Sequence, residues 1–318
     1  METHRIRPEG LSASSPENFR LSTLDHTVTH NYCTWAIIFK LGDVDSAATI
    51  TEGFKRALAL TLGQCRHYVG KIEKNEHGEF SIVKKADSTV RLDVRQLDHQ
   101  QNGHYQSFSD LEKTNFSAKS LGDPALLAID GMTMSCGHYP SHIGRDVSAF
   151  QLTFIPGGMV FTIHQHHLVG DIFAAASLTR QLAGNCSFIF KGTAPPQWDE
   201  ILMDRSRFIT PRVIIEDPKP SPPIPQKHPD WLPCSWLLFH IRQEKIVELK
   251  KLATPADGTW ISTYDAVIAL IWRVLTKNRA PIYKPDLSTQ AIFMESVNMR
   301  SRRKSSLYAP ARGNCTRT

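Results

Sequence analysis

Apolar residues recur at two spacings in the first part of the chain, and each spacing predicts a different element. The run YCTWAIIF at 32–39 is rich in β-branched and aromatic residues, which favours a strand. After a short loop, four apolar residues recur every four positions, as on one face of a helix: Ile50, Phe54, Leu58 and Leu62. We therefore predict a strand followed by a helix, then short strands at 79–84 and 89–97, and few regular elements up to residue 144.

A second strand and helix pattern follows in the middle of the chain. Two β-type runs, 149–155 and 159–166, are separated by Pro156-Gly157-Gly158, whose backbone freedom suits a tight reversal, so we predict a hairpin. An alanine-rich helix is expected directly after it, with Asp171 as its N-cap and Gly184 at its end. The segment HHLVGD at 166–171 therefore lies at a strand-to-helix turn.

Prolines crowd the segment from 191 to 233, where six of them lie between Pro218 and Pro229. Proline cannot continue a helix or a central strand, so we predict a crossover linker. Beyond it we expect a strand at 235–241, a helix opened by a capping box at Ser262, and a strand at 290–299. Five apolar residues fall on one face of that helix, which we therefore assign to the core: Val267, Leu270, Ile271, Val274 and Leu275.

Length and composition indicate an ordinary globular protein, with two domains as the natural expectation. The chain has 318 residues, of which 41% are hydrophobic and 21% charged, and a net charge of +6. We interpret the basic cluster of Arg300, Arg302, Arg303 and Lys304 as a solvated strand end in preference to a phosphate contact. No aromatic residues interleave with it as a nucleic-acid platform requires, so we expect no nucleic-acid partner.

Cysteine spacing and hydropathy bear on the compartment. The six cysteines are widely scattered and none has the C-x-x-C spacing, so buried thiols are predicted. The first ten residues are polar and lack the apolar core of a secretory signal, and no apolar run reaches the ~20 residues of a membrane span. We therefore expect a cytoplasmic protein without a membrane partner, and a monomer.

Three imidazoles and a carboxylate lie within the eight residues from His164 to Asp171. On a strand alternate side chains share a face, so His164 and His166 point one way, whereas His167 at the strand end is separate from them. A residue there is rigidly held yet reaches a cleft, which suits a general base. Three simpler roles stay open: Asp171 as a plain N-cap, packed histidines at 164 and 166, or a metal site made of these three residues. We favour no metal.

The segment His166-His167-Leu168-Val169-Gly170-Asp171 resembles the H-H-x-x-x-D motif of the BAHD family of acyl-coenzyme A-dependent acyltransferases, including its trichothecene acetyltransferase-like fungal branch. Three further segments resemble that family in the same order. LSTLD at 21–25 is similar to its opening L-S-x-L-D, and ISTYDA at 261–266 with Trp272-Arg273 is similar to its I-S-x-x-D-A and W-R helix. VNMRSR at 297–302 is similar to its V-D-x-R-x-R strand, so the likeness runs from about residue 20 to 302.

This resemblance implies an α/β (α+β) fold of the chloramphenicol acetyltransferase type, with mixed sheets in two domains and a channel between them. The implied domains are 1–190, which carries the motif, the linker 191–233, and a partial C-terminal domain at 234–318. Acyl-coenzyme A, preferably acetyl-coenzyme A, would be the co-substrate, and a small acceptor the other partner. His167 would be the general base on the acceptor hydroxyl or amine. Asp171 would be structural, paired with an arginine, for which we take Arg300 as a hypothesis.

One signature of the same family, D-F-G-W-G, is not found in the 318 residues. In the family that region belongs to the second domain, which we therefore expect to be incomplete here. A truncated fragment or a pseudoenzyme without activity is accordingly the alternative to an O-acyltransferase of secondary metabolism, and a His/Asp metal-dependent enzyme is the third possibility.

Overall fold

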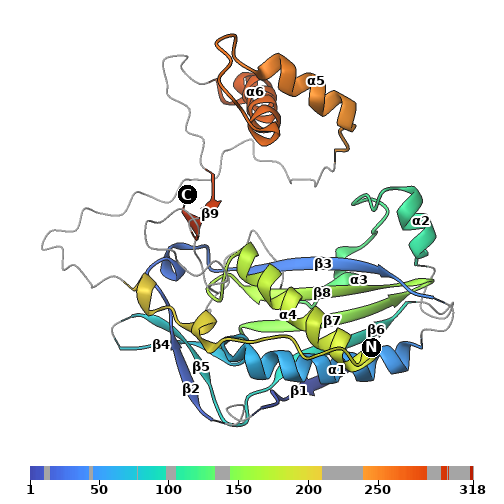
Figure 1. Cartoon of the computed structure of the whole chain (residues 1–318), viewed down its shortest axis with the longest axis vertical. Helices are drawn as coiled ribbons and strands as arrows, with labels where there is room; N and C mark the ends of the chain where they lie inside the picture. Colours follow the sequence, from blue (N-terminus) through green and yellow to red (C-terminus); the bar gives the residue numbers. More distant parts are fainter. Residues whose placement is uncertain are drawn as a thin grey trace, which may run out of the picture. The chain divides into compact units, whose positions relative to one another are not determined.

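The computed structural model in Figure 1 describes residues 1–10, 15–42, 46–76, 78–97, 105–132, 144–209, 239–284, 295–298, 300 and 316–317. The chain divides into two compact units. The first comprises Met1–Pro225 and Glu295–Thr318, and the second comprises Gln226–Met294. The boundaries predicted at 190 and 233 remain predictions, because residues 210–238 lie outside the described part.

A five-stranded mixed sheet forms the centre of the first unit (Figure 1). Its strand order is β1-β6-β7-β8-β3, with β6 parallel to β7 and every other pair antiparallel. The strands are β1 (Glu2–Ile6), β6 (Val90–Gln96), β7 (Ser148–Ile155), β8 (Gly158–His166) and β3 (Tyr32–Lys40). The predicted hairpin is therefore confirmed as β7 and β8, and Gly157 supplies the positive φ of +69° that its turn requires.

Both faces of this sheet are covered, which explains why β7 and β8 are buried along their whole length. On one face lie α1 (Ala47–Gln64) and α4 (Ile172–Lys191), and the ring of Phe54 meets that of Phe161 with their centroids 4.9 Å apart. The predicted stripe on α1 is confirmed, since Leu58 and Leu62 are fully buried. On the other face, a smaller cluster joins Leu111 and Leu127 to Val160.

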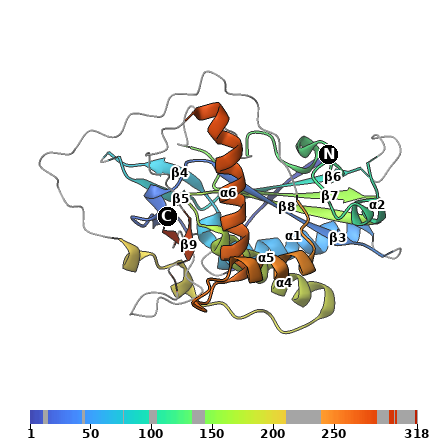
Figure 2. The ribbon, with the colours of Figure 1, turned by 90° about the horizontal axis from the view of Figure 1, so that it is seen from above.

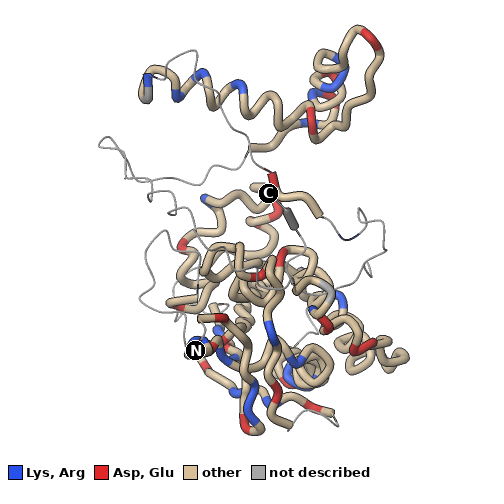
Figure 3. The backbone as a smooth tube through the Cα atoms, turned by 90° about the vertical axis from the view of Figure 1, so that its left-hand side faces the viewer, with Lys and Arg blue, Asp and Glu red and all other residues tan. Residues whose placement is uncertain are grey.

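The strands predicted at 79–84 and 89–97 are confirmed as β5 (Phe80–Lys84) and β6. Strand β5 lies in a second sheet of order β2-β5-β4, whose other strands, β2 (Glu17–Arg20) and β4 (Lys71–Lys74), are short and were not predicted. The region expected to be irregular contains α2 (Phe108–Lys113) and α3 (Pro124–Leu127). Strands β9 (Val297–Asn298) and β10 (Thr316–Arg317) pair with each other. Figure 3 shows basic and acidic residues interspersed along this unit, in line with the small net charge.

The end of α4 corrects one prediction. The helix continues through Gly184 and stops at Gly192, which adopts the left-handed conformation with φ +65° and ψ +25°. Gly184 instead allows a close approach, because a Cβ built on it would lie 2.7 Å from Cβ of Pro196. The glycine is therefore explained by a tertiary contact and not by helix termination.

The second unit contains α5 (Gln243–Ala253) and α6 (Thr263–Tyr283), which lie side by side (Figure 2). The predicted capping box is confirmed: the Ser262 hydroxyl accepts from the Asp265 N–H at 3.0 Å, and the Asp265 carboxylate accepts from the Ser262 N–H at 2.7 Å. The predicted core face is wrong, because Leu270, Ile271, Val274 and Leu275 are 39–46% exposed. In the described part of this unit only α5 packs against α6, and one helix cannot cover that stripe.

Three remaining predictions meet the described residues only in part. Of the strand expected at 235–241, residues 235–238 lie outside the description, and Phe239–Ile241 form no strand. Of the strand expected at 290–299, Val297–Asn298 is present and 290–294 lie outside. Among the described cysteines, Cys65 is buried as predicted, whereas Cys33 and Cys186 are only partly buried. No helix in the described part of the chain is long and apolar enough to cross a membrane.

Candidate active site at the turn after β8

The segment HHLVGD occupies the turn between β8 and α4, as predicted. His166 is the last residue of β8, residues 167–169 form the turn, and Asp171 is the N-cap of α4. The backbone N–H of His167 donates to the carbonyl of Asn31 at 2.8 Å, which ties the turn to the start of β3. The His167 side chain is partly exposed, whereas those of His164 and His166 are fully buried.

Asp171 combines the two roles that the sequence left open. Its Oδ1 accepts from the N–H groups of Phe173 at 3.1 Å and Ala174 at 3.0 Å, so it caps α4. The same carboxylate receives a bidentate ion pair from Arg300, with Nη1 3.0 Å from Oδ2 and Nη2 2.9 Å from Oδ1. Both partners are buried, each with a side chain 3% exposed.

Besides Asp171, two further groups hold Arg300 in place. The side-chain oxygen of Asn298 accepts from the Arg300 N–H at 3.1 Å and from its Nη1 at 3.2 Å. The guanidinium carbon lies 5.5 Å from the centroid of the Phe173 ring. The interpretation of Arg300 as part of a solvated basic cluster is therefore wrong, because the ion pair with Asp171 takes it into the interior. Its neighbours Arg302, Arg303 and Lys304 lie outside the described residues.

A second buried arginine, Arg205, holds the turn from the other side, and no pattern in the sequence marks it. Its guanidinium donates to the carbonyls of Leu168 and Val169, at 3.4 Å and 2.5 Å, and pairs with Asp25 at 2.9 Å. Asp25 is the last residue of the LSTLD segment and also accepts from the N–H and hydroxyl of Ser22, each at 2.7 Å. Arg205 thereby connects the LSTLD segment to two carbonyls of the HHLVGD segment.

A buried amide completes the support of the turn. Gln165 donates from Nε2 to the carbonyl of Gly170 at 2.6 Å, and its Oε1 accepts from the hydroxyl of Tyr68 at 2.9 Å. Tyr68 is held in turn because its carbonyl accepts from the Ser148 hydroxyl at 2.7 Å. All three residues between His167 and Asp171 therefore have carbonyls that accept from buried side chains, namely Leu168, Val169 and Gly170. This gives the turn a single geometry.

His164 belongs to a different environment from the turn. Its Nε2 accepts from the Ile129 N–H at 3.2 Å, and its Nδ1 lies 2.7 Å from the carbonyl of Met132, which requires a neutral ring protonated on Nδ1. Burial lowers the pKa of His164 to about 4. The ring has no lone pair left for a metal ion. The described residues contain no cluster of histidine, cysteine and carboxylate side chains able to hold one.

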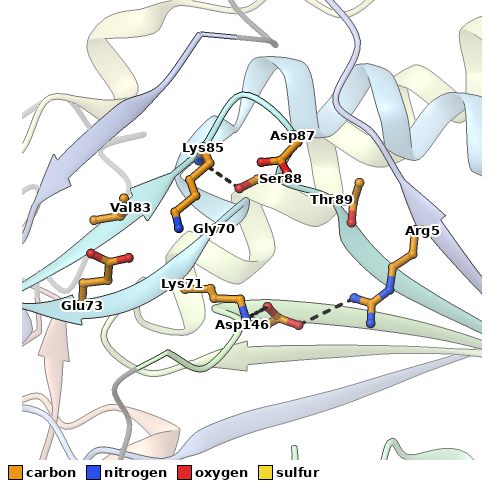
Figure 4. Close-up of a pocket in the computed structure, with 10 residues that line it drawn as sticks. All are labelled: Arg5, Gly70, Lys71, Glu73, Val83, Lys85, Asp87, Ser88, Thr89 and Asp146. Atoms are coloured by element: carbon orange, nitrogen blue, oxygen red, sulfur yellow. Dashed lines mark hydrogen bonds and ion pairs between the residues drawn. The ribbon is translucent and has the colours of Figure 1, made fainter.

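Two pockets lined by described residues of the first unit lie away from the turn. One, of about 350 Å³, has charges of both signs in its wall, and Asp146 lies 3.8 Å from Arg5 and 3.9 Å from Lys71 (Figure 4). The other, of about 490 Å³, is mainly apolar and lies between the sheet and its two long helices. Neither includes His167 in its wall.

Comparison with known proteins shows that the chain is similar to acetyltransferases. A family model for the trichothecene 3-O-acetyltransferase-like N-terminal domain matches residues 32–186. The acetyltransferase FGR3 of Gibberella zeae is 43% identical over 92% of the chain and 59% of its own length. The trichothecene 3-O-acetyltransferase TRI101 of Fusarium sporotrichioides is 24% identical over 80% of the chain and 56% of its own. The chain thus spans less than two thirds of the length of these relatives.

Solved structures agree on the fold. The crystal structure of F. graminearum TRI101 complexed with ethyl coenzyme A superposes with a TM-score of 0.72 over 95% of the chain and 68% of TRI101, at 20% identity. Vinorine synthase gives a TM-score of 0.66 over 99% of the chain and 68% of its own, also at 20% identity. The predicted mixed α/β acyltransferase fold is therefore confirmed. More narrowly, residues 32–186 match the trichothecene 3-O-acetyltransferase-like N-terminal domain, which confirms the resemblance to this branch over that part of the chain.

Proposed function

We propose that this chain provides the catalytic base of an acyl-coenzyme A-dependent O-acyltransferase, which transfers an acyl group, preferably acetyl, to a hydroxyl of a small secondary metabolite. The observation that carries the proposal is the position of His167. It is a partly exposed residue on a turn that two buried arginines, Arg205 and Arg300, hold in one geometry. The relatives FGR3 and TRI101 are both named acetyltransferases, which supports this class of reaction.

The reaction needs one proton acceptor near the acceptor oxygen. The neutral His167 ring takes the hydroxyl proton as that oxygen attacks the thioester carbonyl, which forms a C–O bond and a tetrahedral intermediate. Collapse of the intermediate breaks the C–S bond, and the departing thiolate of coenzyme A takes this proton from the imidazolium. A positioned base of this kind contributes about 10² to 10⁴ in rate. No acyl-enzyme is formed.

Asp171 and Arg300 act on geometry in this scheme. The Asp171 carboxylate is occupied by two backbone N–H groups and a bidentate guanidinium, so its lone pairs face α4 and Arg300. We assign it to holding the turn that carries His167, not to proton transfer. A metal mechanism through His164, His166 and Asp171 has less support, because the His164 nitrogens are bonded to backbone groups.

The test is an assay for released thiol when the purified chain is mixed with acetyl-coenzyme A and a panel of hydroxylated metabolites. The panel includes trichothecene and eremophilane alcohols, because two relatives are named for these acceptors. We expect coenzyme A release, an acetylated product in the mass spectrum, and neither from His167→Ala. Calorimetric binding of coenzyme A without any turnover would instead support the inactive alternative. The cytoplasmic location and the monomeric state stay predictions of the sequence.

A further inference from the structure

The apolar pocket of the first unit has the properties of a ligand site. It lies between strands β3 and β8 and helices α1 and α4, and its volume of about 490 Å³ falls within the range typical of small-molecule pockets. Apolar side chains form most of its wall: Ile37, Phe39, Phe54, Met159, Phe161 and Leu182. The pocket is therefore suited to the apolar part of a ligand, which has no hydrogen-bonding groups.

Most polar groups along the pocket are already engaged or neutral. The Thr179 hydroxyl donates to the carbonyl of Ala175 at 2.9 Å, and the Ser187 hydroxyl accepts from that of Thr193 at 3.2 Å. Burial raises the pKa of the Cys186 thiol to about 11, which keeps it a neutral thiol. None of these groups needs a polar ligand group as a partner deep in the pocket.

Lys191 is the single charged residue in the wall. It is the last residue of α4, one turn after Ser187, so the two side chains lie on the same face of the helix. Lys191 makes no ion pair with any residue in the described part of the chain. The wall thus has one polar end, formed by the Lys191 ammonium and the Ser187 hydroxyl, and one long apolar region.

The pocket is separate from the candidate active site. His167 lies six positions after Phe161 of the wall along β8 and its turn, and at about 3.3 Å per residue this separation spans roughly 20 Å. Gly53 defines the wall between the helices, because a Cβ there would lie 2.2 Å from the Phe190 ring, so this ring lies directly on the α1 backbone. A ligand here would be held by rigid elements, at a distance from acyl transfer.

We propose that this pocket binds an aliphatic monocarboxylate of medium chain length, with the chain between α1 and α4 and the carboxylate on Lys191. The apolar wall selects the aliphatic chain of the ligand, and the Lys191 ammonium selects a single negative charge. Such a ligand stabilises the packing of α1 and α4 and is not consumed. This inference does not depend on the acyltransferase activity.

The test compares two ligands of equal length, decanoate and decan-1-ol, by titration calorimetry on the whole chain. We expect both to bind with one site. Lys191→Gln should weaken decanoate about tenfold or more, because a charge-assisted hydrogen bond is lost, and should leave decan-1-ol within about twofold. An equal effect on the two ligands, or none on either, would overturn the assignment of the carboxylate to Lys191.

The position of the ligand's aliphatic chain is tested by filling the pocket. Ala183 is an exposed residue of α4 that lines the pocket, so Ala183→Trp should abolish binding of both ligands without unfolding the helix. The matched control is Ala48→Trp, on the exposed surface of α1 outside the wall, which should bind as the wild type does. Circular dichroism verifies the fold of each variant. Absence of decanoate binding to the wild type, or unchanged binding to Ala183→Trp, would refute the site.

Discussion

The histidines at the end of β8 and the histidine of the turn that follows differ in what holds their rings. His164 is bonded through both nitrogens to the backbone near Ile129 and Met132. His166 accepts the Leu168 N–H on Nδ1 at 3.2 Å, and its ring meets the Tyr32 ring edge-on at 5.1 Å. His167 is positioned instead by its main chain and keeps part of its ring exposed. The two histidines of the strand are thus buried and bonded, whereas His167, which we propose as the base, stays partly exposed.

The largest expected effect comes from removing the ring of His167, which distinguishes it from the two histidines of the strand. In His167→Ala we expect turnover to fall about 10² to 10⁴-fold, because the proton acceptor is lost. The melting temperature should stay close to that of the wild type, since the ring is partly exposed. Thiol release and a thermal melt measure the two effects. Retained activity would show that another group accepts the proton.

Breaking the ion pair behind the turn comes next in size. Asp171→Ala and Arg300→Ala each leave one buried charge without its partner, so we expect a loss of about 3–5 kcal/mol in the free energy of unfolding. In a double-mutant cycle the two changes should be strongly non-additive. Urea unfolding provides the measurement, and Glu52→Ala, which removes an exposed pair with Lys55, is the control that should change little. Additive effects would contradict the pair.

The strand histidine His164 should give the protein a pH-dependent stability. Its pKa is about 4 in the folded state against 6.5 for the free side chain, so between these values only the unfolded chain binds the proton. Stability is therefore complete above pH 6.5 and falls by up to about 3 kcal/mol as the pH drops to about 4. Urea unfolding at several pH values should show a shallower decline for His164→Gln. Identical pH profiles for the two proteins would rule out His164 as the source.

The smallest effect concerns the carbonyls of the turn. Arg205→Lys keeps the positive charge beside Asp25 but loses the planar fork that donates to Leu168 and Val169. We expect a loss of about 1–2 kcal/mol in stability. We also expect kcat to fall more than KM changes, because His167 loses its fixed position. Steady-state kinetics with a saturating acceptor separates the two constants. A change confined to KM would mean that Arg205 acts on binding.

Local signals in the sequence were sufficient where neighbouring residues determine the structure. The stripe on α1, the hairpin at Gly157, the Asp171 cap and the Ser262 capping box all depend on contacts within a few positions. Burial of a helix depends on a partner as well. The stripe of α6 has the same period as that of α1, yet it is exposed because no described sheet of its unit lies on it.

The site was predictable only in part for a related reason. The Asp171–Arg300 pair was expected from the family resemblance of VNMRSR, since nothing in the local pattern joins residues 129 positions apart. Arg205 was missed because its partner Asp25 lies 180 positions away and no periodicity marks either residue. Gly184 was misinterpreted for the same reason, because Pro196 determines its role.

The distance along the chain between Asp171 and Arg300 also has a temporal consequence. Arg300 is translated 129 residues after Asp171, which at about 5–20 residues per second takes roughly 6 to 26 seconds. Until Arg300 has been made, the Asp171 carboxylate lacks this counter-ion, so the buried ion pair behind the turn is completed only late in the synthesis of the chain.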